Sequence, residues 1–362
     1  MRKIFGWAWA AVLALGGCQP VQLSSQARML DWPEGTHPYA PSGFYVHEYA
    51  SGLNRPGNLI VADNGDVFVA ESQSITLLRD SNGDGHPEVR SAFLSGLDRP
   101  YGMAINGNQF LVACSGGVDS YAYTAGQLWL SSSKKRILQL PAGESSLHWQ
   151  RNLLLDQAQQ KLYVTVGSAT SAGEAGMQKE YRRANILEVD IPSGAERVYA
   201  SGLAGPLGLD WSTSGQLWSV VAASGSGKDY VTSIQNGAFY GWPKRESSGP
   251  PAVAPDLPLS DACEAQGLSF YRGRRFPSHY RDGAFVSLHG TARRSGLSGF
   301  KVIFIPFLQG LPAGPPEDFL IGFVPDHSRN QAYGRPSAVG VAWDGSLLIS
   351  DDGGNRIWRV SR

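Results

Sequence analysis

Apolar and polar residues alternate in short runs along most of the chain, and glycine turns separate the runs. Residues 58–63 and 67–71 illustrate the pattern, because two strand-like runs flank a turn at Gly65. Alternation with a period of two predicts β-strands, and a glycine between two such runs predicts a hairpin turn. The pattern therefore predicts a succession of β-hairpins from about residue 42 to the C-terminus.

The hairpin unit recurs six times, each time after a short loop. The loops begin near residues 51, 95, 148, 201, 265 and 333, so successive units start roughly 44 to 68 residues apart, a spacing typical of four-stranded propeller blades with insertions. Residues 42–49 precede the first unit and residues 355–360 follow the last, and we expect the two segments to share one blade. We predict an all-β, six-bladed β-propeller with four-stranded blades over residues 42–362, its ring closed by the N- and C-terminal strands.

The N-terminal residues are typical of an export signal rather than of the fold. Arg2 and Lys3 precede an apolar run over residues 4–17 that is too short to span a bilayer comfortably. We therefore predict a signal peptide over residues 1–17.

The signal ends at Gly16-Gly17-Cys18, which resembles a bacterial lipobox. The resemblance implies that Cys18 is acylated and becomes the mature N-terminus, and Gln19 after it favours the outer membrane, facing the periplasm. An ordinary secretory signal, in which Cys18 has no role, is the alternative. Residues 18–41 show no core pattern and predict a tether, so that a lipid anchor is the one membrane contact we expect.

Composition narrows the function classes. The chain has 31 basic and 31 acidic residues and no basic run, which excludes the electrostatic footprint of a nucleic-acid binder. With 44 Gly and 22 Pro among 362 residues, a helical bundle is also excluded. Cys114 and Cys263 remain after the signal, and both a disulfide and two separate thiols stay open.

Propeller geometry gathers many functional groups on one face. The loop that leads into each innermost strand and the loop that follows the second strand open on the same side, and Arg, His and carboxylate groups there suit a polar, anionic ligand. The first kind of loop carries Arg55, Arg99, Tyr101, His148, Arg151, Gln266 and Arg335, and the second carries Glu71, Ser168, His289, Arg293, Arg294, Asp351 and Asp352.

Several motifs are similar to those of a known enzyme family. They are Ser-Gly-Leu-Asp-Arg-Pro-Tyr-Gly at 95–102, His-Trp-Gln-Arg-Asn-Leu at 148–153, Asn-Gly-Ala-Phe-Tyr-Gly-Trp-Pro at 236–243 and Leu-Ile-Ser-Asp-Asp-Gly at 348–353. Over about residues 42–362 the chain resembles the bacterial sorbosone-dehydrogenase-like family, relatives of soluble glucose dehydrogenase and aldose sugar dehydrogenases. These proteins are six-bladed propellers that use pyrroloquinoline quinone (PQQ) with calcium.

The resemblance implies a site and a reaction. His148 corresponds to the general base that takes the proton of a sugar or aldehyde-hydrate hydroxyl while hydride passes to the quinone, and Arg151 belongs to the same catalytic motif. Electrons then pass to an external acceptor. The residues implied at the cofactor are Arg99, Tyr101, Ser168, Arg293, Arg294, Arg335 and Asp351.

The chain departs from the family pattern at four places. Ala204-Gly205 stands where the family has Arg-Asn, and the acidic loop expected after the next strand is reduced to residues 222–230. Cys263–Gln266 replaces a His-Ser-Ala-Pro segment, and Ala292-Arg293-Arg294 replaces Trp-Asn-Arg. These replacements predict a cofactor site with fewer donors than is usual in the family.

A second, separate metal site is predicted on an acidic hairpin. Residues 80–85 read Asp-Ser-Asn-Gly-Asp-Gly, so that Asp80, Asn82 and Asp84 are candidate calcium ligands. An EF-hand is excluded because Ser91 occupies the twelfth position, where a Glu is required. An acidic hairpin tip without a metal is the alternative.

Two further functions compete with the dehydrogenase. One is a non-catalytic propeller that binds a sugar or a cell-surface partner and has lost its cofactor site. The other is a lactonase-type propeller with one divalent metal in the channel, for which Glu71 is the candidate ligand. A nucleotide cofactor and a serine hydrolase are not indicated, because the sequence has neither a Gly-x-Gly-x-x-Gly turn nor a nucleophile elbow.

Overall fold

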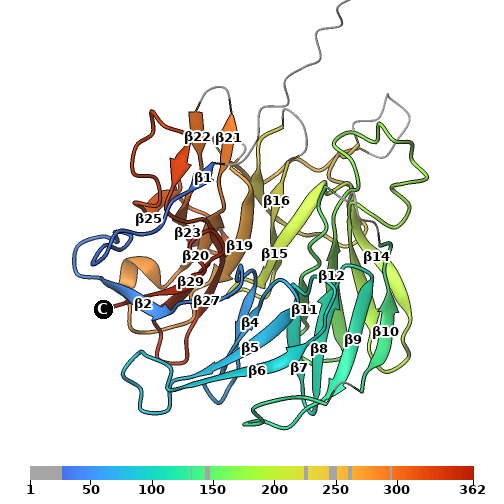
Figure 1. The fold of residues 1–362 in the computed structure, drawn as a ribbon. Helices are drawn as coiled ribbons and strands as arrows, with labels where there is room; N and C mark the ends of the chain where they lie inside the picture. The colour runs from blue at the N-terminus through green and yellow to red at the C-terminus, as the bar shows by residue number, and fades with distance from the viewer. Residues whose placement is uncertain are drawn as a thin grey trace, which may run out of the picture.

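The computed structural model consists almost entirely of β-strands. It describes residues 27–131, 133–142, 147–223, 227–243, 251–259, 263–293 and 296–362. Six antiparallel sheets follow one another along these residues, which confirms the predicted six-bladed propeller (Figure 1). Cys18 and the predicted signal peptide lie outside the described residues.

The first three blades are simple four-stranded meanders, each running outward from an innermost strand. Blade 1 contains β3 (Leu59–Val61), β4 (Val67–Ala70), β5 (Ser74–Arg79) and β6 (Val89–Ser95); blade 2 contains β7 (Met103–Asn106), β8 (Gln109–Cys114), β9 (Gly117–Ala122) and β10 (Lys135–Gln139); blade 3 contains β11 (Leu153–Leu155), β12 (Lys161–Val166), β13 (Asn185–Asp190) and β14 (Glu196–Ser201).

Blade 5 has an additional strand and an added hairpin, whereas blades 4 and 6 have four strands each. Blade 4 contains β15 (Gly205–Trp211), β16 (Leu217–Ala222), β17 (Tyr230–Ser233) and β18 (Leu257–Pro258); blade 5 contains β19 (Ala265–Phe270), β20 (Gly283–Leu288), β23 (Lys301–Leu308), β24 (Leu311–Pro312) and β25 (Glu317–Leu320), with the hairpin β21 (Thr291–Arg293) and β22 (Gly296–Ser298) and a 3-10 turn (Ser278–Tyr280); blade 6 contains β27 (Pro336–Val341), β28 (Leu347–Asp351), β29 (Arg356–Ser361) and β2 (Tyr45–Ala50).

Blade 6 closes the ring with both ends of the propeller. Strand β2 pairs antiparallel with β29, and Val46 lies opposite Val360 (Figure 1). The predicted closure by N- and C-terminal strands is therefore confirmed. The pairing covers the outer edge of β29, and β2 becomes the outermost strand of the blade.

Packing between blades explains the apolar runs in the sequence. Each second strand is covered on both faces, so that every residue of β4, β20 and β28 is buried. A strand buried on both faces needs a continuous apolar run rather than strict alternation. Phe68, Phe93 and Phe110 meet in one cluster between blades 1 and 2, with ring centroids 4.6 to 5.0 Å apart.

The described part of the predicted tether is packed on the propeller. Strand β1 (Arg28–Met29) pairs with β26 (Gln331–Ala332), and the ring of Trp32 lies within 5.7 Å of the rings of Phe323, Tyr333 and Trp358. The tether prediction relied on the absence of a periodic apolar pattern, but a few large aromatic side chains are enough to dock an irregular segment.

Cys114 and Cys263 are separate thiols, and both are buried. Among the described residues, no helix has the length and apolar character that crossing a membrane requires.

Candidate active site

A cavity of about 880 Å³ is lined by residues of all six blades. The lining comes from loops that lead into the innermost strands and from loops that follow the second strands, as the repeat geometry predicts. Nine of the residues expected on this face line the cavity: Arg55, Glu71, Arg99, Tyr101, His148, Gln266, His289, Arg335 and Asp352.

One position of the repeat supplies a ring of lining residues. In every blade it lies four residues before an apolar residue of the innermost strand. That residue is Leu59 in blade 1, for example, and Leu268 in blade 5. In blade order the six residues are Arg55, Arg99, Trp149, Gly205, Glu264 and Arg335, and all six line the cavity. The ring therefore holds three guanidinium groups, one indole, one carboxylate and one glycine, which brings no side chain.

His148 lies against two glycines from neighbouring blades. A Cβ added to Gly167 would lie 2.3 Å from the His148 Cβ, and one added to Gly205 would lie 2.7 Å from its Nδ1 and Cε1. Only glycine permits these approaches, so the two positions fix where the imidazole sits. The replacement of the family's Arg-Asn by Ala204-Gly205 thus makes room for this ring.

Burial keeps His148 uncharged. It lowers the pKa of the imidazole to about 4, an effect that the nearby Arg151 reinforces and Glu264 opposes. At neutral pH the side chain is therefore a neutral imidazole in the wall of the cavity.

Arg151, expected beside the reacting atoms, lies behind the cavity instead. Its guanidinium is 1% exposed and donates hydrogen bonds to the carbonyls of His148 (2.8 Å) and Gln150 (2.9 Å). Arg151 therefore holds the loop that carries His148 rather than contacting a ligand.

Ser168 and Asp351 also lie outside the lining. The Ser168 hydroxyl is buried and donates to the carbonyl of Thr170 at 2.9 Å. The buried Asp351 accepts from the backbone N–H groups of Arg335 and Gly354, both at 2.7 Å, and its second oxygen accepts from Trp358 and Trp32. Successive residues of a strand point to opposite sides, so Asp351 turns inward where Asp352 reaches the cavity.

Two predicted arginines are not placed. Arg293 ends strand β21, but its side chain and the whole of Arg294 lie outside the described residues.

In blade 5, a second imidazole of the lining lies between two carboxylates. The Nε2 of His289 is 2.9 Å from Asp352 Oδ1, and its Nδ1 is 3.1 Å from Glu264 Oε2. Burial disfavours the charged ring, but the two carboxylates outweigh it and raise the pKa of His289. The same contacts lower the pKa values of Asp352 and Glu264, although burial alone would raise them.

Glu264 is the functional residue that the sequence did not single out. Its Oε2 also accepts from the Arg335 Nη2 at 3.0 Å, so one carboxylate joins two cations. The sequence shows Glu264 only as part of a segment that replaces a family motif. The signal that identifies it is its place in the repeat, which is the place of Arg55 and Arg99.

An aromatic wall adjoins His148. The ring of Trp149 lies under the guanidinium of Arg99, 5.4 Å from Cζ to the centroid, and meets the Tyr101 ring edge-on at 6.3 Å. These two contacts hold the indole at the side of the cavity. Arg99 and Tyr101 thus line the site as predicted.

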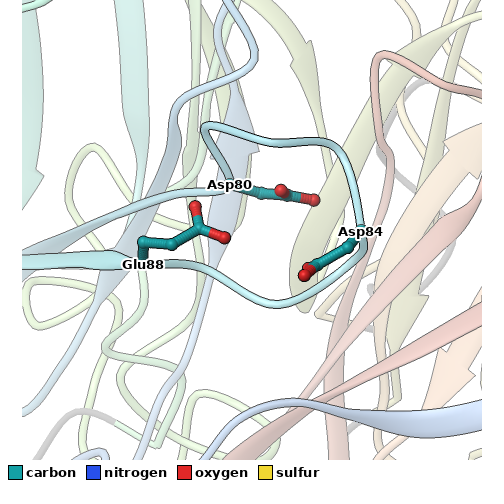
Figure 2. Close-up of side chains that lie close together, drawn as sticks. All are labelled: Asp80, Asp84 and Glu88. Atoms are coloured by element: carbon teal, nitrogen blue, oxygen red, sulfur yellow. The ribbon is translucent and has the colours of Figure 1, made fainter.

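The predicted calcium hairpin lies at the β5–β6 turn, away from the cavity. Figure 2 shows Asp80, Asp84 and Glu88 turned toward one another, and their oxygens lie within 4.8 Å. Asn82 instead donates to Asp84 at 3.0 Å, and the carboxylate of Asp80 accepts from backbone N–H groups of the turn. Calcium binding here stays a prediction.

Within the described residues, that hairpin is the one place where three His, Cys, Asp or Glu ligand atoms gather. Glu71, the candidate metal ligand of a lactonase, is committed inside the protein, because it accepts from the Asn54 backbone and the Thr76 hydroxyl. The described cavity therefore gives a lactonase metal centre no support.

Comparison with known proteins places the chain in a family. A family model described as TrAA12-like matches residues 38–238. A protein of Borreliella burgdorferi described as uncharacterized is 27% identical over 248 residues, 61% of this chain and 62% of that protein.

Solved structures share the fold. The PQQ domain of pyranose dehydrogenase from Coprinopsis cinerea, in its holo form, has a TM-score of 0.76 at 17% identity and covers 90% of this chain and 97% of its own. A calcium structure of family AA12 from Trichoderma reesei has 0.77 at 16%, covering 95% and 99%. The PQQ-bound aldose sugar dehydrogenase from Streptomyces coelicolor has 0.65 at 18%, covering 89% and 99%.

The family model covers more than half of the 362 residues, and the resemblance to PQQ-dependent sugar dehydrogenases that the motifs indicated is confirmed: the chain belongs to the TrAA12-like family.

Proposed function

We propose that this protein oxidises a small sugar or aldehyde with PQQ and calcium as cofactors, with His148 as the general base and an external electron acceptor. One observation carries the proposal: an uncharged imidazole lies in the wall of a cavity that also holds three arginines. Alcohol oxidation requires a base that is free at neutral pH beside the hydroxyl group.

The donors of the cavity fit a planar tricarboxylate such as PQQ. Guanidinium groups pair with carboxylates through two parallel hydrogen bonds, and Arg55, Arg99 and Arg335 all reach the lining. Because Arg335 already pairs with Glu264, we expect Arg55 and Arg99 to hold most of the cofactor's charge, with the amide of Gln266 as a neutral donor. When bound, PQQ supplies a quinone that takes up a hydride from the substrate carbon.

The residues of this chain account for the proton and for orientation. His148 accepts the hydroxyl proton on an imidazole nitrogen, while Gly167 and Gly205 keep the ring in place. Arg151 fixes the carbonyl of the same loop. Calcium requires oxygen ligands, and Asp98 and Asp352 bring carboxylates to the lining.

Cofactor uptake tests the proposal directly. Purified protein is mixed with PQQ and calcium at micromolar concentrations, and the quinone absorption is followed before and after aldoses or aldehydes are added. We expect uptake and then sugar-dependent reduction that an artificial acceptor reverses. No uptake favours the non-catalytic binding propeller, and bound quinone that no aldose or aldehyde reduces refutes the dehydrogenase.

We further propose that the protein is exported and held at the periplasmic side of the outer membrane by a lipid on Cys18. The apolar run and the Gly16-Gly17-Cys18 sequence support this. A Cys18→Ser variant should leave the membrane fraction and appear in the soluble periplasm. Unchanged membrane retention, with no lipid mass on the wild type, would refute the anchor.

A further inference from the structure

Glu264 is the one carboxylate in the six-position ring of the cavity, and it sits directly on two cations. Its Oε2 is 3.0 Å from Arg335 Nη2 and 3.1 Å from His289 Nδ1. Arg335 occupies the next position of the same ring, in blade 6. A carboxylate of this chain thus occupies the donors that face the cavity from blades 5 and 6.

The backbone around Glu264 is fixed in an unusual conformation. Glu264 has φ of +52°, in the left-handed region that residues with a Cβ rarely adopt. The Asp229 carboxylate accepts from the N–H groups of both neighbours, Cys263 (3.0 Å) and Ala265 (2.9 Å). The loop therefore aims the Glu264 side chain, as the equivalent left-handed residues Arg55 and Arg99 are aimed in blades 1 and 2.

The four charged groups differ in how firmly they are held. The side chains of Arg335 and His289 are 8% exposed and that of Asp352 is 15% exposed, whereas that of Glu264 is 43% exposed. Arg335 and His289 also have other partners, the carbonyl of Gly290 and the carboxylate of Asp352. Glu264 is therefore the member that leaves at the lowest cost.

We propose that Arg335 and His289 form an anion site for an organic carboxylate, and that Glu264 is its internal counter-ion, which the ligand displaces on binding. This rests on the proposed function in so far as PQQ is the carboxylate expected in the cavity. The geometry makes Glu264 a competitor of that ligand, which sets how tightly the protein takes it up.

The proposal predicts a gain rather than a loss. With Glu264 neutral, Arg335 loses its carboxylate partner and His289 keeps only that of Asp352, so one negative charge is removed from the site. An incoming carboxylate then no longer competes with an intramolecular one, and charge-assisted hydrogen bonds are the strong ones. We expect Glu264→Gln and Glu264→Ala to bind a tricarboxylate about 10- to 100-fold more tightly than the wild type.

Calorimetric titration tests this with two probes, PQQ with calcium and benzene-1,3,5-tricarboxylate, on the full-length protein. Glu71→Gln is the matched control, because Glu71 lines the same cavity and its carboxylate accepts from the Asn54 backbone and the Thr76 hydroxyl rather than from a cation. We expect tighter binding of both probes by the Glu264 variants and a change below about twofold for Glu71→Gln. Thermal unfolding confirms that each variant is folded.

The outcomes separate this inference from the proposed function. Tighter binding of the simple tricarboxylate without PQQ uptake by any variant supports the counter-ion and refutes the PQQ dehydrogenase. Unchanged or weaker binding of both probes by both Glu264 variants overturns the counter-ion. An equal gain in Glu71→Gln also overturns it, because the effect would then be one of general charge.

Discussion

Two histidines face the same cavity, His148 from blade 3 and His289 from blade 5, and their pKa values are shifted in opposite directions. His148 lies between two glycines, with a buried arginine behind it, and its pKa is lowered to about 4. His289 lies between two carboxylates, and its pKa is raised. Both rings are largely buried, so burial does not explain the difference between their pKa values. The neighbouring charged groups explain it.

One cavity thus separates two chemical roles, that of a proton acceptor and that of a cation. A neutral imidazole has a lone pair and accepts a proton, whereas an imidazolium has only donors and acts as a fixed cation. Pairs of titratable groups with opposing shifts are a common mark of active sites. The side around His148 is therefore suited to proton transfer, and the side around His289 is suited to holding negative charge.

The largest expected effect comes from removing the base. His148→Gln should lower the rate of sugar-dependent quinone reduction by about a thousandfold, because general bases contribute roughly 10²- to 10⁴-fold. PQQ affinity should change less than about twofold, since a base acts mainly in the transition state. Stopped-flow reduction and equilibrium uptake measure the two quantities separately, and equal losses in both would contradict the assignment.

Removing the Asp352 carboxylate beside His289 should lower the free energy of unfolding. Asp352→Asn removes the carboxylate 2.9 Å from His289, and opening a buried ion pair costs about 3 kcal/mol of unfolding free energy. The raised pKa of His289 contributes stability that is complete below its unfolded value and is lost as pH rises through the folded value. The lowered pKa of Asp352 contributes stability that is lost as pH falls through its folded value.

Urea unfolding at pH 6 and pH 9 measures this. We expect the difference between wild type and Asp352→Asn to be larger at pH 6 than at pH 9. Asp326→Asn is the control, because that carboxylate lies on the surface and pairs with the exposed Arg329 at 3.4 Å. Its variant should unfold at the same urea concentration as the wild type, and a larger loss at pH 9 for Asp352→Asn would contradict the ion pair.

A smaller effect is expected from moving His148 without removing it. Gly205→Ala places a Cβ 2.7 Å from the imidazole and 3.0 Å from the Ala222 carbonyl oxygen, so the ring must shift. We expect kcat to fall about 10-fold with KM nearly unchanged, since small displacements of catalytic groups are costly. Gly116→Ala, where the added Cβ meets only Ala142 at 3.7 Å, should have no effect. Equal activities of the two variants would show that Gly205 does not position the base.

The fold was predictable because its determinants are local and repeated. Alternating apolar residues around turns such as Gly65 and Gly345 mark each hairpin, and both glycines have positive φ in the structure. The spacing of the repeats then requires a ring. The docking of Trp32 was not predictable, since it depends on aromatic partners about 300 residues away in the sequence.

The site was predictable only in outline. Loop positions brought His148, Arg99, Tyr101 and Arg335 to the cavity. Successive side chains point to opposite sides, so a shift of one residue decides which of two neighbours faces the cavity. Asp352 lines the cavity, and Asp351 points into the protein. The pairing of Glu264 with His289 and Arg335 joins loops 25 and 71 residues apart, which no local pattern encodes.

The smallest effect, and the sharpest test of the two histidines, is the acid side of the pH profile. A base with a pKa of about 4 is about 97% neutral at pH 5.5, whereas an ordinary histidine with a pKa near 6.5 is only about 9% neutral there. We therefore expect kcat/KM to fall by less than about twofold between pH 7.5 and pH 5.5, and then to fall tenfold per unit below pH 4. Glu264→Gln should move that limb to lower pH, because Glu264 opposes the lowering of the His148 pKa. A limb centred near pH 6.5 in the wild type would mean that His148 is solvated like a surface histidine, and the contrast between the two sides of the cavity would then not govern the chemistry.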